Sequence, residues 1–267
     1  MSGFLERVIA ERRADAAAAR VSDPDPLAAG PGPSVRSLPA ALAAARAAGR
    51  LAVIAEVKRH SPALGALRPE ADVVAIARAY EAAGATAISV LTEPRHWGGS
   101  LADLKAVHDA VGIPVVCKDV VVDPHQLRAA RAAGADAVLL IGEALDDPTL
   151  ALFLRDAEAL GMAALVEAHE PEAFDRVIAS GATIVGVNAR DLRHPERLDP
   201  ERIVALAPRV PDGPFLVAES GIGSVADAAR LPARVDAILV GTALMRAGDP
   251  APLMSALAAI RRSTVPE

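Results

Sequence analysis

Leu51-Ala52-Val53-Ile54-Ala55-Glu56-Val57-Lys58 is an almost continuous apolar run that ends in charged residues. A run of this length without polar alternation is typical of a strand that is buried on both faces, as in a parallel sheet. The same pattern, an apolar run followed by a longer alanine-rich stretch, occurs eight times in the chain. The eight runs are Leu51–Val57, Ala85–Leu91, Ile113–Lys118, Asp136–Ile141, Ala163–Glu167, Thr183–Asn188, Phe215–Glu219 and Asp236–Gly241.

The stretches between these runs have the composition and spacing of amphipathic helices. Examples are Glu70–Ala83, Asp123–Ala133, Glu170–Ser180 and Ser224–Leu231. Glycine precedes several runs, at Gly84, Gly134 and Gly181, where it suits the end of a helix that leads into a strand. Eight such units predict an α/β fold of the closed (β/α)8 TIM barrel type. The alternative, an open doubly wound sheet, usually has fewer units.

The first 50 residues do not share this repeat. Residues 4–20 are rich in Ala, Glu and Arg and predict a helix, and the Pro- and Gly-rich stretch 23–33 predicts a loop. Ser37 is a candidate N-cap for a second helix over 38–48, with Pro39 in its first turn. We therefore expect a helical extension with a Pro/Gly linker over 1–50 and a barrel catalytic domain over 51–267.

Composition narrows the class of protein. The net charge of −6 and pI of about 5.6 argue against a nucleic-acid-binding surface. The single cysteine, Cys117, allows no intramolecular disulfide and no cysteine-based zinc cluster, which indicates a reducing compartment such as the cytoplasm. The N-terminal residues lack the apolar region of a signal peptide, and no apolar run reaches the ~18 residues of a membrane span. The sequence does not decide between a monomer and a weak oligomer.

Polar side chains gather where five of the runs end. They are Lys58, Lys118 with Asp119, Glu167, Asn188 and Glu219. A charged group that closes an apolar strand is unfavourable unless it is paired or lies in a solvated site. The carboxyl ends of barrel strands are where barrel enzymes have their active sites. One such residue could be a structural ion pair, but five together predict an active site.

Two glycine loops add a second signal. Ser220–Ser224 follows the seventh run, and Gly241–Ala243 follows the eighth. In barrels these two loops often bind phosphate through backbone N–H groups, and glycine lets the backbone approach it closely. Either loop alone could be a plain turn, whereas the pair predicts a phosphate site.

The chain resembles the indole-3-glycerol-phosphate synthase family in a series of motifs that occur in family order. They are Ala55–Pro62, Ser89–Glu93 followed by Gly99-Ser100, Lys118-Asp119, Leu165–His169, Asn188–Leu192, Ala218–Ile222 and Gly241–Met245. The resemblance implies the substrate 1-(2-carboxyphenylamino)-1-deoxyribulose 5-phosphate, which undergoes ring closure and loses CO2 and water to give indole-3-glycerol phosphate for tryptophan biosynthesis. It implies no cofactor and no metal, and the sequence shows no dinucleotide fingerprint or convincing metal-ligand cluster.

The resemblance also implies roles at the matching positions. Lys118 is the general acid that protonates the ketose carbonyl, and Glu167 is its partner carboxylate, as a base or as a stabiliser of positive charge. Glu56 pairs with one of the lysines and is the candidate base of the last step. Lys58 binds the anthranilate carboxylate or the phosphate, or acts as acid in dehydration. Which lysine donates which proton stays open.

Further positions are implied as substrate ligands. Asn188 and Arg190 hold the substrate and the catalytic carboxylates, and Glu219 contacts a ribulose hydroxyl. Ser61 and Ser220 form hydrogen bonds with the substrate. The phosphate is held by backbone N–H groups of Gly221, Gly241 and Thr242.

Four positions depart from the family pattern. Val120 stands where Phe is common, Trp97 where another aromatic, typically Phe, is usual, and Ala63-Leu64 where Ser-Lys is frequent. The changes leave the acid–base residues intact and bear on the shape of the aryl pocket. Trp97 is therefore either a pocket residue or part of the loop packing.

Two other functions compete with the synthase. One is another sugar-phosphate lyase or aldolase barrel, in which Lys118 or Lys58 would form a Schiff base. Borohydride trapping with substrate distinguishes the two, because the synthase needs no imine. The other is a catalytically inactive barrel that binds a metabolite, and the intact set of charged residues argues against it. Cys117 is expected to be a packed core thiol.

Overall fold

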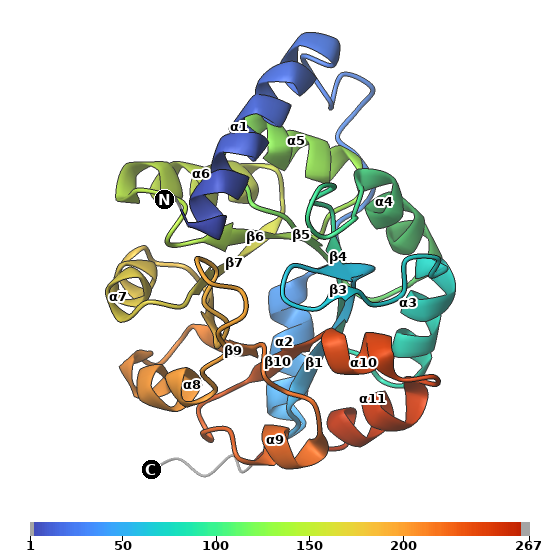
Figure 1. The fold of residues 1–267 in the computed structure, drawn as a ribbon, viewed down its shortest axis with the longest axis vertical. Helices are drawn as coiled ribbons and strands as arrows, with labels where there is room; N and C mark the ends of the chain where they lie inside the picture. The colour runs from blue at the N-terminus through green and yellow to red at the C-terminus, as the bar shows by residue number, and fades with distance from the viewer. Residues whose placement is uncertain (1–2, 263–267) are drawn as a thin grey trace.

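The computed structural model describes residues 3–262, and the eight predicted runs form a closed barrel in it (Figure 1). The strands are β1 (Ala52–Val57), β4 (Ala87–Leu91), β5 (Val115–Lys118), β6 (Ala137–Ile141), β7 (Ala163–Ala168), β8 (Ile184–Asn188), β9 (Phe215–Glu219) and β10 (Ala237–Val240). All neighbours are parallel, and β10 pairs with β1 to close the barrel. The predicted (β/α)8 fold is confirmed.

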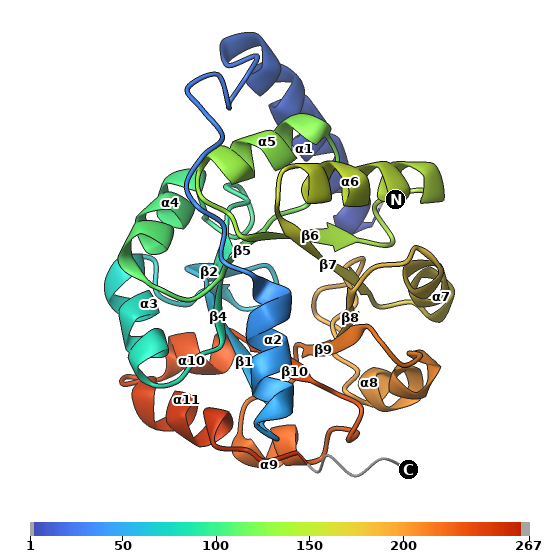
Figure 2. The same ribbon diagram turned by 180° about the vertical axis from the view of Figure 1, so that it is seen from behind.

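Helices surround the strands in both face views (Figures 1 and 2). They are α3 (Val73–Ala82), α4 (Leu101–Ala110), α5 (Pro124–Ala132), α6 (Asp147–Ala159), α7 (Pro171–Ala179), α8 (Glu201–Leu206) with the 3-10 turn Ala207–Arg209, α9 (Val225–Ala229), α10 (Thr242–Arg246) and α11 (Ala251–Ala258). Side chains cap several first turns, as Asp123 does for α5 together with Gln126. No helix in the described part of the chain is long and apolar enough to cross a membrane.

One element was not predicted. A short hairpin of β2 (His60–Ser61) and β3 (Gly65–Ala66) follows β1 at the carboxyl end of the barrel. Its strands have two residues each, which is too short to leave a periodic pattern in the sequence. Gly65 has a φ of +71°, a backbone conformation that glycine adopts without strain.

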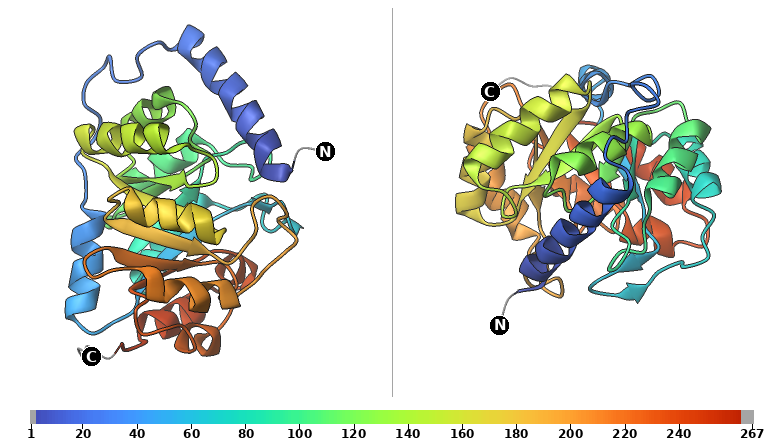
Figure 3. Two further views of the ribbon diagram at one scale, coloured as in Figure 1. Left: turned by 90° about the vertical axis from the view of Figure 1, so that its left-hand side faces the viewer. Right: turned by 90° about the horizontal axis from the view of Figure 1, so that it is seen from above.

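The two N-terminal helices lie at opposite ends of the barrel (Figure 3, left). α2 (Leu38–Ala47) packs against the amino-terminal end of β1, and Ser37 caps it by accepting a hydrogen bond from the N–H of Ala40. α1 (Phe4–Ser22) lies over the carboxyl ends of the strands, where its first residues line the cavity described below. The division of the chain at residue 50 stays a prediction.

A buried carboxylate ties the linker to the barrel. Asp136, just before β6, accepts hydrogen bonds from the N–H of Arg36 (2.7 Å) and from the N–H of Val115 at the start of β5 (2.8 Å). Its side chain is fully buried. This one residue therefore satisfies backbone donors of two segments that are far apart in the sequence.

We expect Asp136→Ala to lower the free energy of unfolding by about 2–6 kcal/mol, because each buried donor left without an acceptor costs roughly 1–3 kcal/mol. The control is Asp147→Ala, whose side chain is 72% exposed and pairs with Arg176 at the surface. An exposed pair contributes about 0–1 kcal/mol. Urea unfolding followed by circular dichroism measures both changes, and similar losses in the two variants would show that Asp136 has no special role.

Candidate active site

A cavity of about 610 Å³ opens at the carboxyl ends of the strands. Its wall includes every residue that the sequence singled out for the site. They are Glu56, Lys58, Ser61, Trp97, Lys118, Glu167, Asn188, Arg190, Glu219, Ser220, Gly221, Gly241 and Thr242. The closed barrel thus brings together residues that are far apart in the sequence. Glu56 and Gly241, for example, are 185 positions apart. Their chemical roles stay predictions.

Lys118 lies at the centre of a buried ionic network. Its Nζ is 2.7 Å from Oε2 of Glu219 and 3.4 Å from Oε2 of Glu167. Asn188 donates from Nδ2 to the same Glu167 oxygen at 3.2 Å. The family resemblance implied Glu167 as the partner of Lys118 and left open which lysine pairs with Glu56, and the structure adds Glu219 as a closer partner than Glu167.

The network shifts the pKa values of its members. Burial alone would lower the pKa of Lys118, but the negative charges of Glu167, Glu219 and Glu56 outweigh burial and raise it. The pKa of Glu219 is raised well above its usual range by burial and by the nearby charge of Glu167, and Lys118 offsets only part of this. Lys118 therefore carries its proton at neutral pH.

Glu56 and Lys58 form a second ion pair, with 2.6 Å between Oε1 and Nζ. They project from the same face of β1, as the alternation of strand side chains predicts. Burial opposes ionisation of Glu56, but Lys58, Lys118 and Arg190 outweigh it, so its pKa is lowered. Burial lowers the pKa of Arg190, against the charge of Glu56. The pKa of Glu56 is thus lowered, whereas that of Glu219 in the same cavity is raised.

Gly241 has a structural role that the sequence did not predict, and its role in phosphate binding stays a prediction. A Cβ atom at Gly241 would lie 2.2 Å from Oε1 of Glu56, so a side chain there would collide with the carboxylate. Its φ of −122° is one that any residue adopts, so backbone conformation does not require glycine here. The missing side chain makes room for Glu56, in addition to any approach of phosphate.

The predicted phosphate loops follow β9 and β10 and also line the cavity. Ser220 and Gly221 follow β9 with φ values of +68° and +76°, which turns the chain sharply. Thr242 and Ala243 begin α10, and the first N–H groups of a helix have no partner within it. Arg246, at the end of α10, also lines the cavity. Backbone N–H groups and the guanidinium group of Arg246 are thus available to bind an anion in this part of the cavity.

Trp97 lines the cavity, so it is more than loop packing. Its ring meets Phe4 of α1 edge-on, with centroids 5.8 Å apart. Buried Glu93 holds the loop by accepting from the N–H groups of Arg95 (3.0 Å), His96 (2.6 Å) and Trp97 (3.1 Å). The contact of the ring with Phe4 and the hydrogen bond of the backbone to Glu93 thus hold Trp97 in place.

Sequence reasoning missed the contribution of α1 to the site. Phe4 and Leu5 line the cavity. Arg12 holds the helix there through two hydrogen bonds to the buried Asp119, at 2.9 and 3.0 Å, and Thr92 donates to the same carboxylate at 2.7 Å. In the sequence, the only sign of this contact is Asp119, the acidic residue that follows Lys118.

Cys117 has the expected structural role. Its thiol is buried, and burial, followed by the charge of Asp119, raises its pKa to about 12. A thiol in this state is a poor nucleophile. Among residues 3–262, a group of side chains that could hold a metal ion, His169, Glu170 and Asp191, lies outside the wall of the cavity.

Comparison with known proteins identifies the family. The profile of indole-3-glycerol phosphate synthase matches residues 5–257. The chain belongs to the indole-3-glycerol phosphate synthase family. The synthase of Parafrankia sp. (strain EAN1pec) is 54% identical over 211 residues, which are 79% of this chain and 78% of that protein. The synthase of Mycolicibacterium vanbaalenii is 52% identical over 210 residues, 78% of this chain and 76% of that protein.

Solved structures with low sequence identity support the fold alone. A 3-hexulose-6-phosphate synthase is 20% identical, with a TM-score of 0.63 over 78% of this chain and 99% of that one. A tryptophan synthase chain from M. tuberculosis is also 20% identical, with a TM-score of 0.63 over 85% of this chain and 98% of that one. Membership of the synthase family makes the chain a carboxy-lyase of tryptophan biosynthesis.

We expect Gly241→Ala to lower kcat by about 10²-fold, in the range for loss of an acid–base group, because the new methyl group displaces Glu56 from Lys58. The matched control is Gly248→Ala, where an added Cβ meets nothing within 4 Å. Steady-state turnover of both variants measures the effect. An unchanged kcat together with a raised KM in Gly241→Ala would show that Gly241 serves substrate binding only.

A second prediction concerns Val120 and Trp97, which both line the cavity. We expect that they have exchanged volume, so Val120→Phe alone overpacks the pocket, at about 1–3 kcal/mol, and does not improve KM. Val120→Phe with Trp97→Phe should recover the wild-type KM or better, since an aromatic pair contributes about 0.5–1.5 kcal/mol. A double-mutant cycle on KM measures this, and coupling below about 0.3 kcal/mol would show that the two residues have not exchanged volume.

Proposed function

We propose that this synthase carries out its reaction with the three ion pairs of the cavity, Lys118 with Glu219, Lys118 with Glu167, and Lys58 with Glu56. The observation that supports this most is the 2.7 Å contact of Lys118 with Glu219 inside a buried cavity that Glu167 and Glu56 also line. The substrate is the carboxyphenylamino-deoxyribulose phosphate named above. A desolvated site strengthens each of these charge interactions.

Ring closure joins the aromatic carbon that bears the carboxylate to the carbonyl carbon of the sugar chain. In our proposal, Lys118 donates its proton to the carbonyl oxygen as that oxygen becomes an alkoxide. The raised pKa of Lys118 keeps it protonated until a strongly basic oxygen develops. Glu167 stabilises the positive charge that forms on the aniline nitrogen, and Asn188 orients Glu167 by its hydrogen bond of 3.2 Å.

Loss of CO2 then restores the aromatic ring, and loss of water completes the indole. In our proposal, Lys58 protonates the departing hydroxyl group and Glu56 accepts the proton that is removed from the ring being formed. The lowered pKa of Glu56 keeps its carboxylate ionised, which is the form that can accept a proton, and proton donation by Lys58 removes the positive charge that lowers this pKa. Exchange of roles between the two lysines remains the alternative within this mechanism.

Binding of the substrate uses the rest of the wall. Backbone N–H groups of Gly221, Gly241 and Thr242 hold the phosphate, and Arg190, Ser61 and Ser220 contact the remaining polar groups. Trp97 faces the aryl ring. We propose no cofactor for this reaction and a cytoplasmic location, in keeping with a biosynthetic enzyme that has a single, buried cysteine.

The direct test is to add the substrate to the purified protein and follow indole fluorescence. We expect formation of indole-3-glycerol phosphate with release of one CO2 for each turnover. A protein that binds the substrate without turnover would be an inactive barrel. Borohydride-dependent trapping of the substrate on a lysine would instead indicate a Schiff-base aldolase.

We expect Lys118→Met to reduce kcat by about 10²–10⁴-fold, because loss of a general acid typically costs that much in rate. The matched control is Lys105→Met, which removes a surface lysine that pairs only with Asp109 at 2.7 Å. Circular dichroism of both variants checks that the fold is kept. More than a tenth of wild-type turnover in Lys118→Met would contradict the assigned role.

A further inference from the structure

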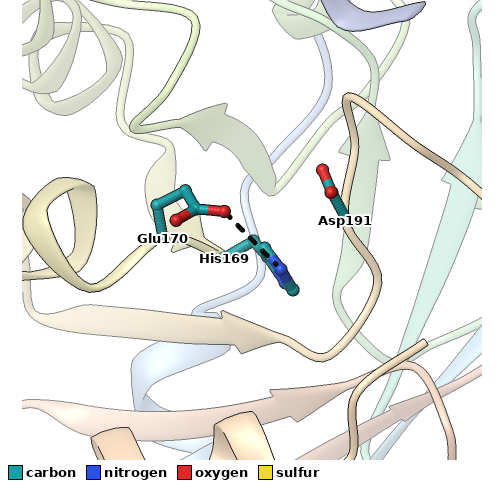
Figure 4. Close-up of side chains that lie close together, drawn as sticks. All are labelled: His169, Glu170 and Asp191. Carbon is teal, nitrogen blue, oxygen red and sulfur yellow. Dashed lines mark ion pairs between the residues drawn. The ribbon is translucent and has the colours of Figure 1, made fainter. Parts of the chain in front are cut away.

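His169, Glu170 and Asp191 form a cluster of metal-ligating side chains beside the active site (Figure 4). His169 and Glu170 follow β7, and Asp191 follows β8. Each offers one ligand atom, and these atoms all lie within 4.8 Å of one another. None of the three residues lines the cavity. The cluster is therefore separate from the residues of the proposed mechanism.

The imidazole of His169 is held in the orientation that a metal ligand needs. The residue is 6% exposed, and its Nδ1 lies 2.8 Å from the carbonyl oxygen of Asn188. A carbonyl oxygen only accepts, so Nδ1 carries the hydrogen and Nε2 of the neutral ring carries the lone pair. Histidines that bind metals commonly donate their other N–H to a carbonyl oxygen in this way.

The spacing suits two ligands of one ion better than a hydrogen bond. Nε2 of His169 is 3.8 Å from Oε1 of Glu170, as the dashed line in Figure 4 marks. Hydrogen bonds between such atoms are about 2.7–3.2 Å long. Two ligands of a tetrahedral ion, each about 2.1 Å from the metal, are separated by about 3.4 Å. A small movement of Glu170 would bring both atoms to an ion.

The surrounding charge is an independent indication of a cation. Glu143 accepts with one oxygen from the N–H of His169 (2.7 Å) and of Glu170 (2.8 Å). Its other oxygen is buried and has no hydrogen-bond partner among residues 3–262. Within the same described range, Glu143, Glu170 and Asp191 form no ion pair with a lysine or an arginine. Two carboxylates of the cluster and the neighbouring carboxylate of Glu143 thus have no lysine or arginine partner among the described residues.

We propose that His169, Glu170 and Asp191 bind a divalent transition-metal ion, with Zn²⁺ as the best match. One imidazole nitrogen with two carboxylate oxygens suits Zn²⁺ better than Mg²⁺, which prefers oxygen ligands alone. Three protein ligands leave a fourth position for water. The sequence did not predict this site, because 20 residues separate Glu170 from Asp191, counted from their numbers.

The ion would fasten the loop after β8 to the end of β7. Asp191 is next to Arg190, and the same loop supplies Leu192, Pro195 and Leu198 to the cavity wall. The backbone around Asp191 is already fixed, since its carboxylate accepts from the N–H of Arg193 at 2.8 Å. The ion therefore has a positioning role for the loop that carries Arg190.

Titration calorimetry of the metal-free protein with Zn²⁺ tests the site without any substrate. We expect one tightly bound ion for each chain, and affinity reduced by more than about 100-fold in Asp191→Asn and in Glu170→Gln, since loss of an outer-shell partner alone reduces affinity by about 10–100-fold. Asp191→Asn keeps the oxygen that accepts from Arg193. The matched control is His194→Asn, because His194 lies 3.8 Å from Glu196 in the same loop but belongs to no such cluster.

A second measurement reads the loop itself. Zn²⁺ should slow hydrogen exchange over residues 190–199 in the wild type and in His194→Asn, and leave it unchanged in Asp191→Asn. Absence of a stoichiometric ion in the wild type, or wild-type affinity in both ligand variants, would overturn the site. Neither readout depends on turnover, so failure here is distinct from failure of the proposed reaction.

Discussion

The ammonium group of Lys118 lies among three buried carboxylates, and the rest of the structure depends on keeping these opposite charges together. An isolated charge inside a protein is strongly unfavourable, so the lysine and its partners are stable only together. The partners come from β1, β7 and β9, which are distant in the sequence. A closed barrel places the ends of all these strands around one cavity, which an open sheet would not do. The chemistry therefore depends on closure between β10 and β1.

The N-terminal helices support the barrel at its two ends. At the amino-terminal end, the carboxylates of Asp136 and Asp236 hold Arg36 and Arg46 of the preceding segment. At the other end, Arg12 reaches the residue next to Lys118 and keeps α1 over the cavity. α1 thus contributes to the wall of the site, and the family profile includes this helix from residue 5.

The repeat of apolar runs predicted the strands, and the charges at their ends predicted the site, because burial and alternation leave a direct trace in sequence. The pairing of Lys118 with Glu219 left no such trace, since the two lie 101 positions apart in the sequence. Likewise, the sequence predicted a phosphate contact at Gly241, and its proximity to Glu56 appears only in three dimensions. The β2–β3 hairpin was too short for any periodic signal. Contacts between distant elements were thus the part that sequence could not predict.

The protein has only three lysines, Lys58, Lys105 and Lys118, so each can be followed by NMR after isotopic labelling of the lysine side chains. The most direct test of the central claim is the titration of Lys118 in the free protein, with its resonance assigned by the Lys118→Met variant. The account predicts that Lys118 remains an ammonium above pH 10.4, about the ordinary pKa of a lysine side chain. Loss of its proton below that pH would contradict the account, because the three carboxylates would then not be holding its charge.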